Sequence, residues 1–267
     1  MCDEIAGRGI APWLPAALAL VFFLPASMSA QVAVPGFSPA PDLPDGRAPS
    51  TPKAGAPEDL TGYWVALVTE DWRFRMITPA KGDYLGVPLN AEGIRVTGTW
   101  DPAKDEAESN QCKAYGAPAI MRVPGRLHIT WENDNTLRID TDAGTQTRVL
   151  HFGGQPPVAG KPQWQGYSSA DWQLMGDGRN PPRGGYLKVE TTQIRPGYLR
   201  KNGVPYSEKV ALTEYFTRVI ESNGDSYLIV TSTVNDPQYL SVPFTTSTHF
   251  KRLPDASGWR PTPCKAR

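Results

Sequence analysis

The sequence lacks an excess of charge of either sign. Its 267 residues include 27 Lys and Arg against 27 Asp and Glu, so the formal net charge is zero. Nucleic acids and anionic membrane surfaces are bound largely through excess Lys and Arg. We therefore expect no nucleic-acid partner for this chain.

Histidine and cysteine are also scarce, and the short motifs that hold metals or phosphates are missing. The chain has three histidines, His128, His151 and His249, and no CxxC or HxH spacing. Neither Gly153-Gly154 nor Gly184-Gly185 opens a capped helix, as a phosphate-binding loop would. The sequence predicts no metal site and no cofactor.

Long apolar runs are absent except near the N-terminus. Residues 10–28 (IAPWLPAALALVFFLPASM) are apolar, and small residues follow up to Ala30. This pattern predicts a secretory signal peptide over residues 1–30, cleaved near Ala30, and a periplasmic or secreted location in a bacterium. An uncleaved anchor is the alternative, because the run approaches the ~20 residues that span a bilayer. After cleavage we expect no membrane insertion.

The next segment, residues 31–58, is rich in proline and poor in large apolar side chains. It contains seven prolines. A segment of this kind buries too little apolar surface to offset the entropy of ordering, so we expect a disordered leader. The folded part is then residues 59–267, a length that a single domain can have.

Two cysteines remain after signal cleavage, because Cys2 leaves with the signal peptide. In an oxidising compartment Cys112 and Cys264 most simply pair with each other. The bond would close a loop of about 150 residues, for which chain entropy gives up to ~5 kcal/mol of stabilisation. Two unpaired buried thiols are the alternative interpretation.

The 27 prolines and 25 glycines disfavour long helices, and the apolar pattern predicts an all-β domain. From Leu60 onward apolar residues recur at every second position, which is typical of strands. Turn residues between these runs favour a single antiparallel β-barrel or sandwich. We predict nine strands, over residues 61–69, 126–132, 136–142, 146–152, 170–174, 185–192, 210–221, 225–235 and 245–253.

One stretch interrupts the strand pattern. Asn90 is a suitable cap for a short helix through Trp100, and Asp101-Pro102 begins a second one that runs to about Tyr115. We expect these two short helices to plug one end of a barrel or to cover one face of a sheet.

Residues 210–221 place a carboxylate among apolar residues. Glu214 shares a strand face with Leu212, Phe216 and Arg218. A carboxylate in such surroundings can act as an acid or a base, so Glu214 and Arg218 are candidate catalytic residues. A solvated or hydrogen-bonded Glu214 without a catalytic role is the alternative.

The following turn bears on which face of this strand is buried. If Asn223-Gly224 is a two-residue turn, Glu214 lies opposite Thr233. The other face, with Tyr215 and Val219, then has no charge until the turn, and it is the better candidate for the core. The sequence leaves the choice between the faces open.

Aromatic residues are abundant in the predicted strands. We name Trp64, Trp131, Trp172 and Tyr215 as candidate ligand-binding residues, because aromatic side chains can line an apolar pocket in a closed sheet. The alternative is that each of them only fills the core.

Several segments of the chain carry a resemblance to other proteins: Cys112 with Gly116 and Pro118, and residues 164–172, 184–192, 203–218 and 234–244. In these segments the chain resembles a family of uncharacterised secreted bacterial β-rich proteins. The resemblance implies a lipocalin-like or calycin-like architecture and no established activity. Relatives often have histidines near the segment that matches Val204–Ser207, whereas this chain has none there, and Tyr206 becomes a third candidate catalytic residue.

Two main functions follow from these expectations. The first is an exported protein that binds a small, largely apolar molecule in a barrel pocket. The alternative is a barrel-pocket acid/base enzyme, an isomerase, lyase or hydrolase, that uses Glu214 or Tyr206 together with Arg218. A third possibility is an interaction module presented by the leader. The sequence does not define the oligomeric state.

Overall fold

A computed structural model describes residues 50–154, 160–175 and 184–267 of the chain. The predicted signal peptide over residues 1–30 lies outside the described residues, as do residues 31–49 of the predicted leader. No helix in the described part of the chain is both long enough and apolar enough to cross a membrane.

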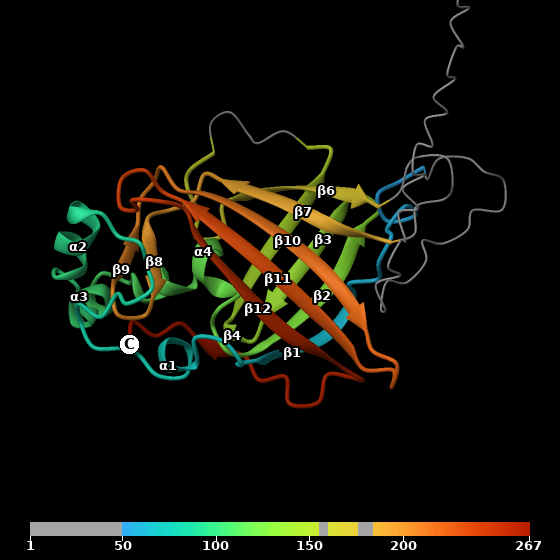
Figure 1. Ribbon diagram of the computed structural model, residues 1–267, viewed down its shortest axis with the longest axis horizontal. Helices are drawn as coiled ribbons and strands as arrows, with labels where there is room; N and C mark the ends of the chain where they lie inside the picture. The colour runs from blue at the N-terminus through green and yellow to red at the C-terminus, as the bar shows by residue number, and fades with distance from the viewer. Residues whose placement is uncertain (1–49, 155–159, 176–183) are drawn as a thin grey trace, which may run out of the picture. The chain divides into compact units, whose positions relative to one another are not determined.

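Nine strands close into a β-barrel, which confirms the all-β fold class and decides for a barrel over a sandwich (Figure 1). Around the barrel the strands follow the order β1-β12-β11-β10-β7-β6-β5-β3-β2. Each of the nine predicted strands corresponds to one of them. The strands are β1 (Gly62–Leu67), β2 (Arg126–Asn133), β3 (Thr136–Thr141), β5 (Gln146–Phe152), β6 (Tyr167–Leu174), β7 (Gly185–Thr192), β10 (Ala211–Ile220), β11 (Ser226–Asn235) and β12 (Phe244–Leu253).

All neighbouring strands of the barrel are antiparallel except one pair. β5 and β6 run parallel, with Leu150 opposite Ser168 and Phe152 opposite Ala170. In a parallel pair the connection has to run back along the sheet, to the end at which the first strand began. The barrel is therefore not purely antiparallel as predicted.

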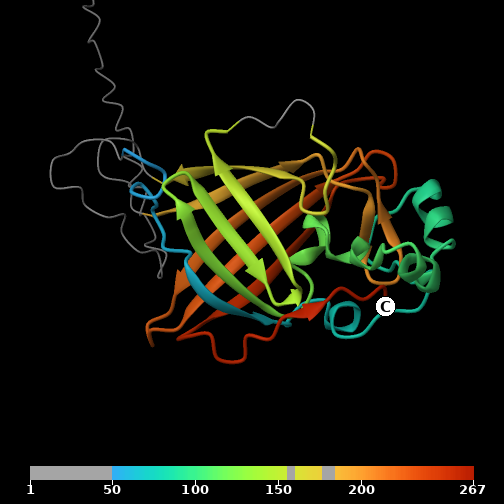
Figure 2. The same cartoon turned by 180° about the vertical axis from the view of Figure 1, so that it is seen from behind.

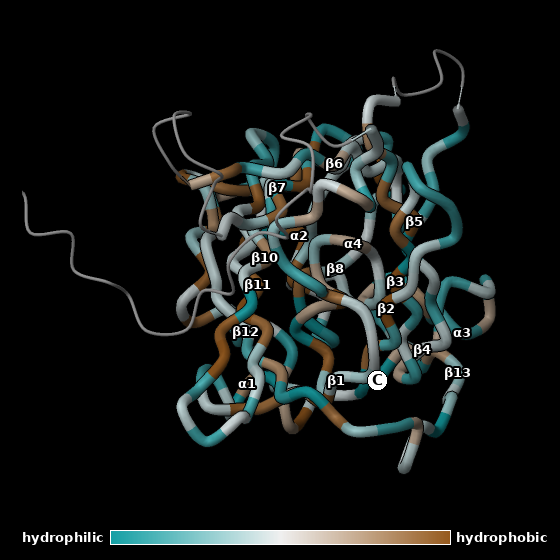
Figure 3. The backbone as a smooth tube through the Cα atoms, turned by 90° about the vertical axis from the view of Figure 1, so that its right-hand side faces the viewer, coloured by the Kyte–Doolittle hydropathy of each residue, from teal (hydrophilic) through white to brown (hydrophobic). Residues whose placement is uncertain are grey.

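Alternate residues of the strands are buried, as the period-two pattern predicts. Figure 3 shows hydrophobic positions along the strand backbones of the barrel. Trp64, Phe216 and Phe250 are the largest apolar side chains that are fully buried in the main core. A second apolar cluster lies around Ile194 and Tyr206 and joins the barrel to the elements beyond its end.

Short helices and small strands gather at one end of the barrel, here called the helical end (Figure 1; Figure 2). Two of the helices fall where they were predicted, and their caps are the predicted ones. Asn90 accepts a hydrogen bond from the Gly93 amide at 2.9 Å, and Asp101 accepts one from the Ala103 amide at 3.0 Å. The elements outside the barrel are α1 (Trp72–Arg75), α2 (Ala91–Thr97), α3 (Pro102–Ala107), the 3-10 helix η1 (Gln111–Tyr115), α4 (Ala117–Ile120), β4 (Ala143–Gly144), β8 (Gly197–Arg200), β9 (Val204–Tyr206) and β13 (Thr262–Pro263).

The prediction of two helices needs two corrections. The second predicted helix is divided into α3 and η1. The sequence also gave no sign of α1 and α4, which have four residues each. Helices this short are held by their packing on the barrel rather than by intrinsic propensity.

A disulfide between Cys112 and Cys264 confirms the predicted pairing. Cys112 belongs to η1, and Cys264 follows β13, which pairs with β4. The bond joins residues that are 152 positions apart, so it ties the C-terminal tail to the helical end.

The predicted register of the β10–β11 hairpin is wrong by one residue. Glu214 lies opposite Ser232 and not Thr233, because the hairpin loop has three residues, Ser222–Gly224, instead of two. The Glu221 amide donates to the Asp225 carbonyl at 2.8 Å and closes this loop. A change of one residue in register moves side chains between faces.

The prediction that the face of β10 with Tyr215 and Val219 lines the core is also wrong. Leu212, Glu214 and Phe216 are buried and point into the barrel, whereas Tyr215 and Val219 are half-buried on the outside. The charge on Glu214 suggested an outward face, but the carboxylate is neutralised inside the barrel by an arginine.

Candidate functional site

A charged pair, Arg148 of β5 and Glu214 of β10, lies inside the barrel with both side chains fully buried. Arg148 donates from Nη1 to Oε1 of Glu214 at 3.1 Å and from Nη2 to Oε2 at 2.5 Å. Ser232 donates to the same carboxylate at 3.3 Å, and Arg148 reaches the Thr191 hydroxyl at 3.4 Å. The carboxylate thus has a bidentate cation and a hydroxyl as partners.

This geometry gives Glu214 a structural role. Removing one partner of a buried ion pair leaves the other charge buried and unpaired. Glu214 lines neither of the two cavities described below. In the described part of the chain its carboxylate oxygens are instead bonded to Arg148 and Ser232 inside the barrel.

Tyr206 is also buried and lies in the second apolar cluster. Its hydroxyl has no hydrogen-bond partner among the described residues, and burial raises the pKa of this phenol above its usual value. Gly116 and Gly197 allow the ring to fit, because a Cβ at either position would collide with the hydroxyl. The surroundings oppose the ionised form that a catalytic base would need.

Arg218 lies at the other end of the barrel and binds the chain that precedes β1. Its amide donates to Oε2 of Glu58 at 2.7 Å, and its Nη1 donates to the Asp59 carbonyl at 3.0 Å. Its Nε donates to the Ser226 hydroxyl at 2.8 Å. The structure therefore does not bring Glu214, Tyr206 and Arg218 together as an acid/base site.

Residues 50–60, which we call the strap, cross the barrel end opposite the helical end. The Lys53 amide donates to the Asp134 carbonyl in the β2–β3 turn at 3.1 Å. Trp172 of β6 donates from Nε1 to the Pro52 carbonyl at 2.9 Å. Arg252 of β12 donates to Asp59 at 3.2 Å. Residues 50–58, placed in the leader by their composition, are thus packed against the barrel.

Three aromatic rings form a row under the strap. The ring centroids of Trp131 and Phe152 are 5.4 Å apart, and those of Phe152 and Trp172 are 5.8 Å apart. All three side chains are only partly buried, unlike the fully buried Phe216 and Phe250 of the same barrel. Each ring packs against the core on one side and leaves part of its aromatic surface outside the core.

A hollow of about 310 Å³ lies between this row and the strap. Phe152, Ala170 and Trp172 form its apolar wall, and residues 50–52 with Gly55 form the strap side. Asp171 contributes a charged group at the edge. The hollow can therefore take a small molecule with a flat apolar part.

Glu58 is the buried acid of the strap. Its side chain is 4 % exposed, and one carboxylate oxygen has no hydrogen-bond partner among the described residues. Burial raises the pKa of Glu58 from 4.5 to about 7, despite the opposing effect of the Arg218 amide and guanidinium. We therefore expect strap attachment to depend on pH near neutrality.

The four predicted ligand-binding residues fall in three places. Trp131 and Trp172 belong to the row under the strap, and Trp172 lines the hollow. Trp64 is fully buried in the core, where its Nε1 donates to the Leu60 carbonyl at 3.0 Å. Tyr215 lies outside the barrel against Tyr186, with ring centroids 5.7 Å apart.

Sequence reasoning missed three residues that matter here, Arg148, Phe152 and Glu58. Arg148 shares its strand face with Leu150 and Phe152, so it carries the same signal of a charge on an apolar face that marked Glu214. Glu58 carried no such signal, because proline-rich composition dominated its surroundings.

The comparisons with known proteins leave the family open. The chain matches no protein-family description, no curated protein and no solved structure. Its resemblance to secreted bacterial β-rich proteins therefore stays a prediction. Within residues 50–154, 160–175 and 184–267, no group of three His, Cys, Asp or Glu side chains is arranged to hold a metal ion.

Proposed function

We propose that the protein is an exported binding protein for a small, largely apolar molecule, held between the strap and the aromatic row. The observation that carries this proposal is the hollow of about 310 Å³ beside the half-buried Phe152 and Trp172. Export is supported by the disulfide, since such bonds persist mainly in oxidising compartments.

The position of the site differs from the expected barrel pocket. Packed side chains fill the interior around Phe216 and Phe250, together with the Arg148–Glu214 pair. The strap end offers partly exposed aromatic rings instead. We expect binding there to need movement only of residues 50–56, which are exposed or half-buried and are attached by the hydrogen bonds of Pro52 and Lys53.

The proposal can be tested with N-phenyl-1-naphthylamine, an uncharged apolar probe that fluoresces in dry sites. We expect saturable binding to the protein. Trp172→Ala should weaken binding by roughly thirtyfold, because a lost aromatic contact of about 2 kcal/mol corresponds to that factor. Titration of each variant by fluorescence gives the Kd.

Trp259→Ala is the matched control. Trp259 is also half-buried, but it packs against Tyr63 and His128 and does not line the hollow. Equal weakening by both substitutions, or an unchanged Kd in Trp172→Ala, would contradict the proposed site. Native mass spectrometry of protein purified from its host should in addition show a retained apolar ligand.

A further inference from the structure

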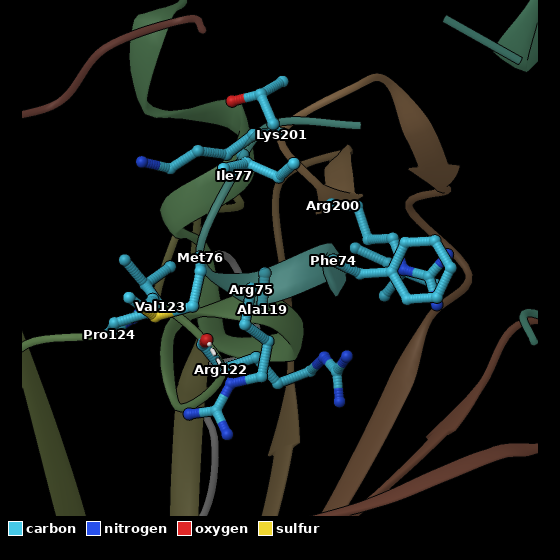
Figure 4. A pocket seen from close by; sticks show the side chains of 13 residues that line it. Phe74, Arg75, Met76, Ile77, Ala119, Arg122, Val123, Pro124, Arg200 and Lys201 are labelled. Atoms are coloured by element: carbon cyan, nitrogen blue, oxygen red, sulfur yellow. Dashed lines mark hydrogen bonds between the residues drawn. The ribbon is translucent and has the colours of Figure 1, made fainter. Parts of the chain in front are cut away.

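A second cavity, of about 80 Å³, lies at the helical end between α1, α4 and β8 (Figure 4). Four cationic side chains line it: Arg75 of α1, Arg122 after α4, and Arg200 and Lys201 at the end of β8. Its apolar lining includes Val123 and the exposed Met76 and Ile77. No residue lines both this cavity and the hollow under the strap.

The three arginines are held in place by contacts on their outer sides. Arg75 is ion-paired with Glu70, and its Nε donates to the Arg122 carbonyl at 2.9 Å. Arg122 donates from Nη2 to Asp71 at 2.8 Å. These contacts fix two guanidinium groups beside each other, as Figure 4 shows.

Arg200 has a different set of partners. It donates from Nη1 to the Leu85 carbonyl at 2.9 Å, and its guanidinium lies 4.0 Å from the centre of the Phe74 ring. Within the described part of the chain, no carboxylate is within ion-pair distance of Arg200. The cluster thus has two paired arginines and a third without a countercharge.

Each arginine also keeps one buried N–H without a hydrogen-bond partner among the described residues. The atoms are Nη2 of Arg75, Nη1 of Arg122 and Nε of Arg200. The side chains of Arg75 and Arg122 are only 1 % and 7 % exposed. Buried donors without acceptors are costly and rare in folded proteins.

Burial and mutual repulsion act on the same groups. Burial and the nearby Arg122 lower the pKa of Arg200 to about 10, and burial is also the largest cause of the lowered pKa of Arg75. Like charges therefore lie close together in the cluster, and Asp71 and Asp83 act on Arg200 only from beyond ion-pair distance.

We propose that this cavity is a binding site for a small oxyanion, a phosphate or a carboxylate group. An oxyanion supplies several acceptor atoms and negative charge at once, and the planar guanidinium group suits both anions. This would satisfy the three unpartnered donors and the uncompensated charge of Arg200. The inference is independent of the proposed apolar ligand under the strap.

Isothermal titration calorimetry with inorganic phosphate and, separately, with acetate tests the proposal, with sodium chloride at matched ionic strength as the blank. We expect saturable binding of at least one anion, and the arm that binds identifies the oxyanion. Arg122→Gln should weaken that binding at least about tenfold, since a charge-assisted hydrogen bond is lost. Arg95→Gln is the control, because Arg95 is exposed on α2 and pairs with Glu92.

If Arg122→Gln does not fold, Glu70→Gln is a second variant that tests the proposal. Glu70 competes with the anion for Arg75, so its neutralisation should tighten binding by about threefold or more. A failure to fold cannot produce tighter binding. Saturable binding of neither anion, or equal affinity in the wild type, Arg122→Gln and Glu70→Gln, would overturn the site.

Discussion

The two ends of the barrel are closed by different means. At the helical end, all four residues of α4 are buried, and the Cys112–Cys264 disulfide holds η1 to the C-terminal tail. At the strap end, closure depends on the hydrogen bond from Trp172 to Pro52 and on the contacts of Glu58 and Asp59. The helical end is fastened covalently and by core packing. At the strap end Pro57, Glu58 and Leu60 are buried, whereas residues 50–56 are exposed or half-buried and are held by hydrogen bonds of Pro52 and Lys53.

This difference indicates where a ligand exchanges. Local opening requires few buried apolar contacts and few hydrogen bonds. Residues 50–56 of the strap meet these conditions, whereas Pro57 and Leu60 of the strap and α4 of the helical end are buried. An apolar ligand is then expected to enter under the strap without any change at the helical end. The arginine-lined cavity lies between elements of both kinds, because all four residues of α4 are buried, whereas only Arg75 of α1 is.

The largest predicted effect concerns the barrel wall that both ends share. Glu214→Ala should lower the free energy of unfolding by about 3–5 kcal/mol, because it leaves Arg148 buried without a countercharge. Replacing both residues with Met and Leu should recover most of this loss. Urea denaturation of the three proteins measures it. A small effect of the single substitution would contradict the structural role of the pair.

The second prediction isolates the helical end. Removal of the disulfide by Cys112→Ala with Cys264→Ala should lower the free energy of unfolding by about 2–4 kcal/mol. Hydrogen exchange should quicken in η1 and β13 but not in the strap. Faster exchange at both ends to the same extent would mean that they are not independently closed.

The third prediction concerns the pH dependence of strap docking, which the helical end should not share. The pKa of Glu58 is raised from 4.5 when free to about 7 when docked, so the protonated acid favours docking. The stabilisation is fully present below pH 4.5, declines as the pH rises to about 7, and is absent above it. The total change is at most about 3 kcal/mol.

Hydrogen exchange of the strap amides between pH 5 and 8, corrected for intrinsic rates, measures this effect. Glu58→Gln should remove the pH dependence, because glutamine can still accept from the Arg218 amide but does not ionise. An unchanged pH profile in this variant would assign the dependence to another group. The helical end should show no matching profile in either protein.

The contrast between the ends could be predicted only in part from the sequence. Alternation of apolar residues located all nine strands of the barrel, and capping by Asn90 and Asp101 located α2 and α3. These are local signals. The paired cysteines added one long-range contact, which fastens the helical end.

Features that depend on distant partners were less predictable. The charge of Glu214 argued against a buried position, because the residue that neutralises it, Arg148, lies 66 positions away in the sequence. The three-residue loop at Ser222–Gly224 shifted the hairpin register by one residue relative to the expected two-residue turn. The strap was obscured because its proline-rich composition is that of a leader, whereas its order comes from contacts with β6, β10 and β12.

The smallest predicted effect tests a single strap attachment. Trp172→Phe keeps an aromatic ring beside Phe152 but removes the N–H that binds the Pro52 carbonyl. Docking of the strap should weaken by about 1 kcal/mol, or roughly fivefold in the exchange of its amides. Trp131→Phe is the control, because it makes the same change of ring in the same aromatic row. If the hydrogen exchange of the strap amides quickens equally in both variants, the aromatic row as a whole holds the strap. The strap end would then be closed by apolar packing, like the helical end.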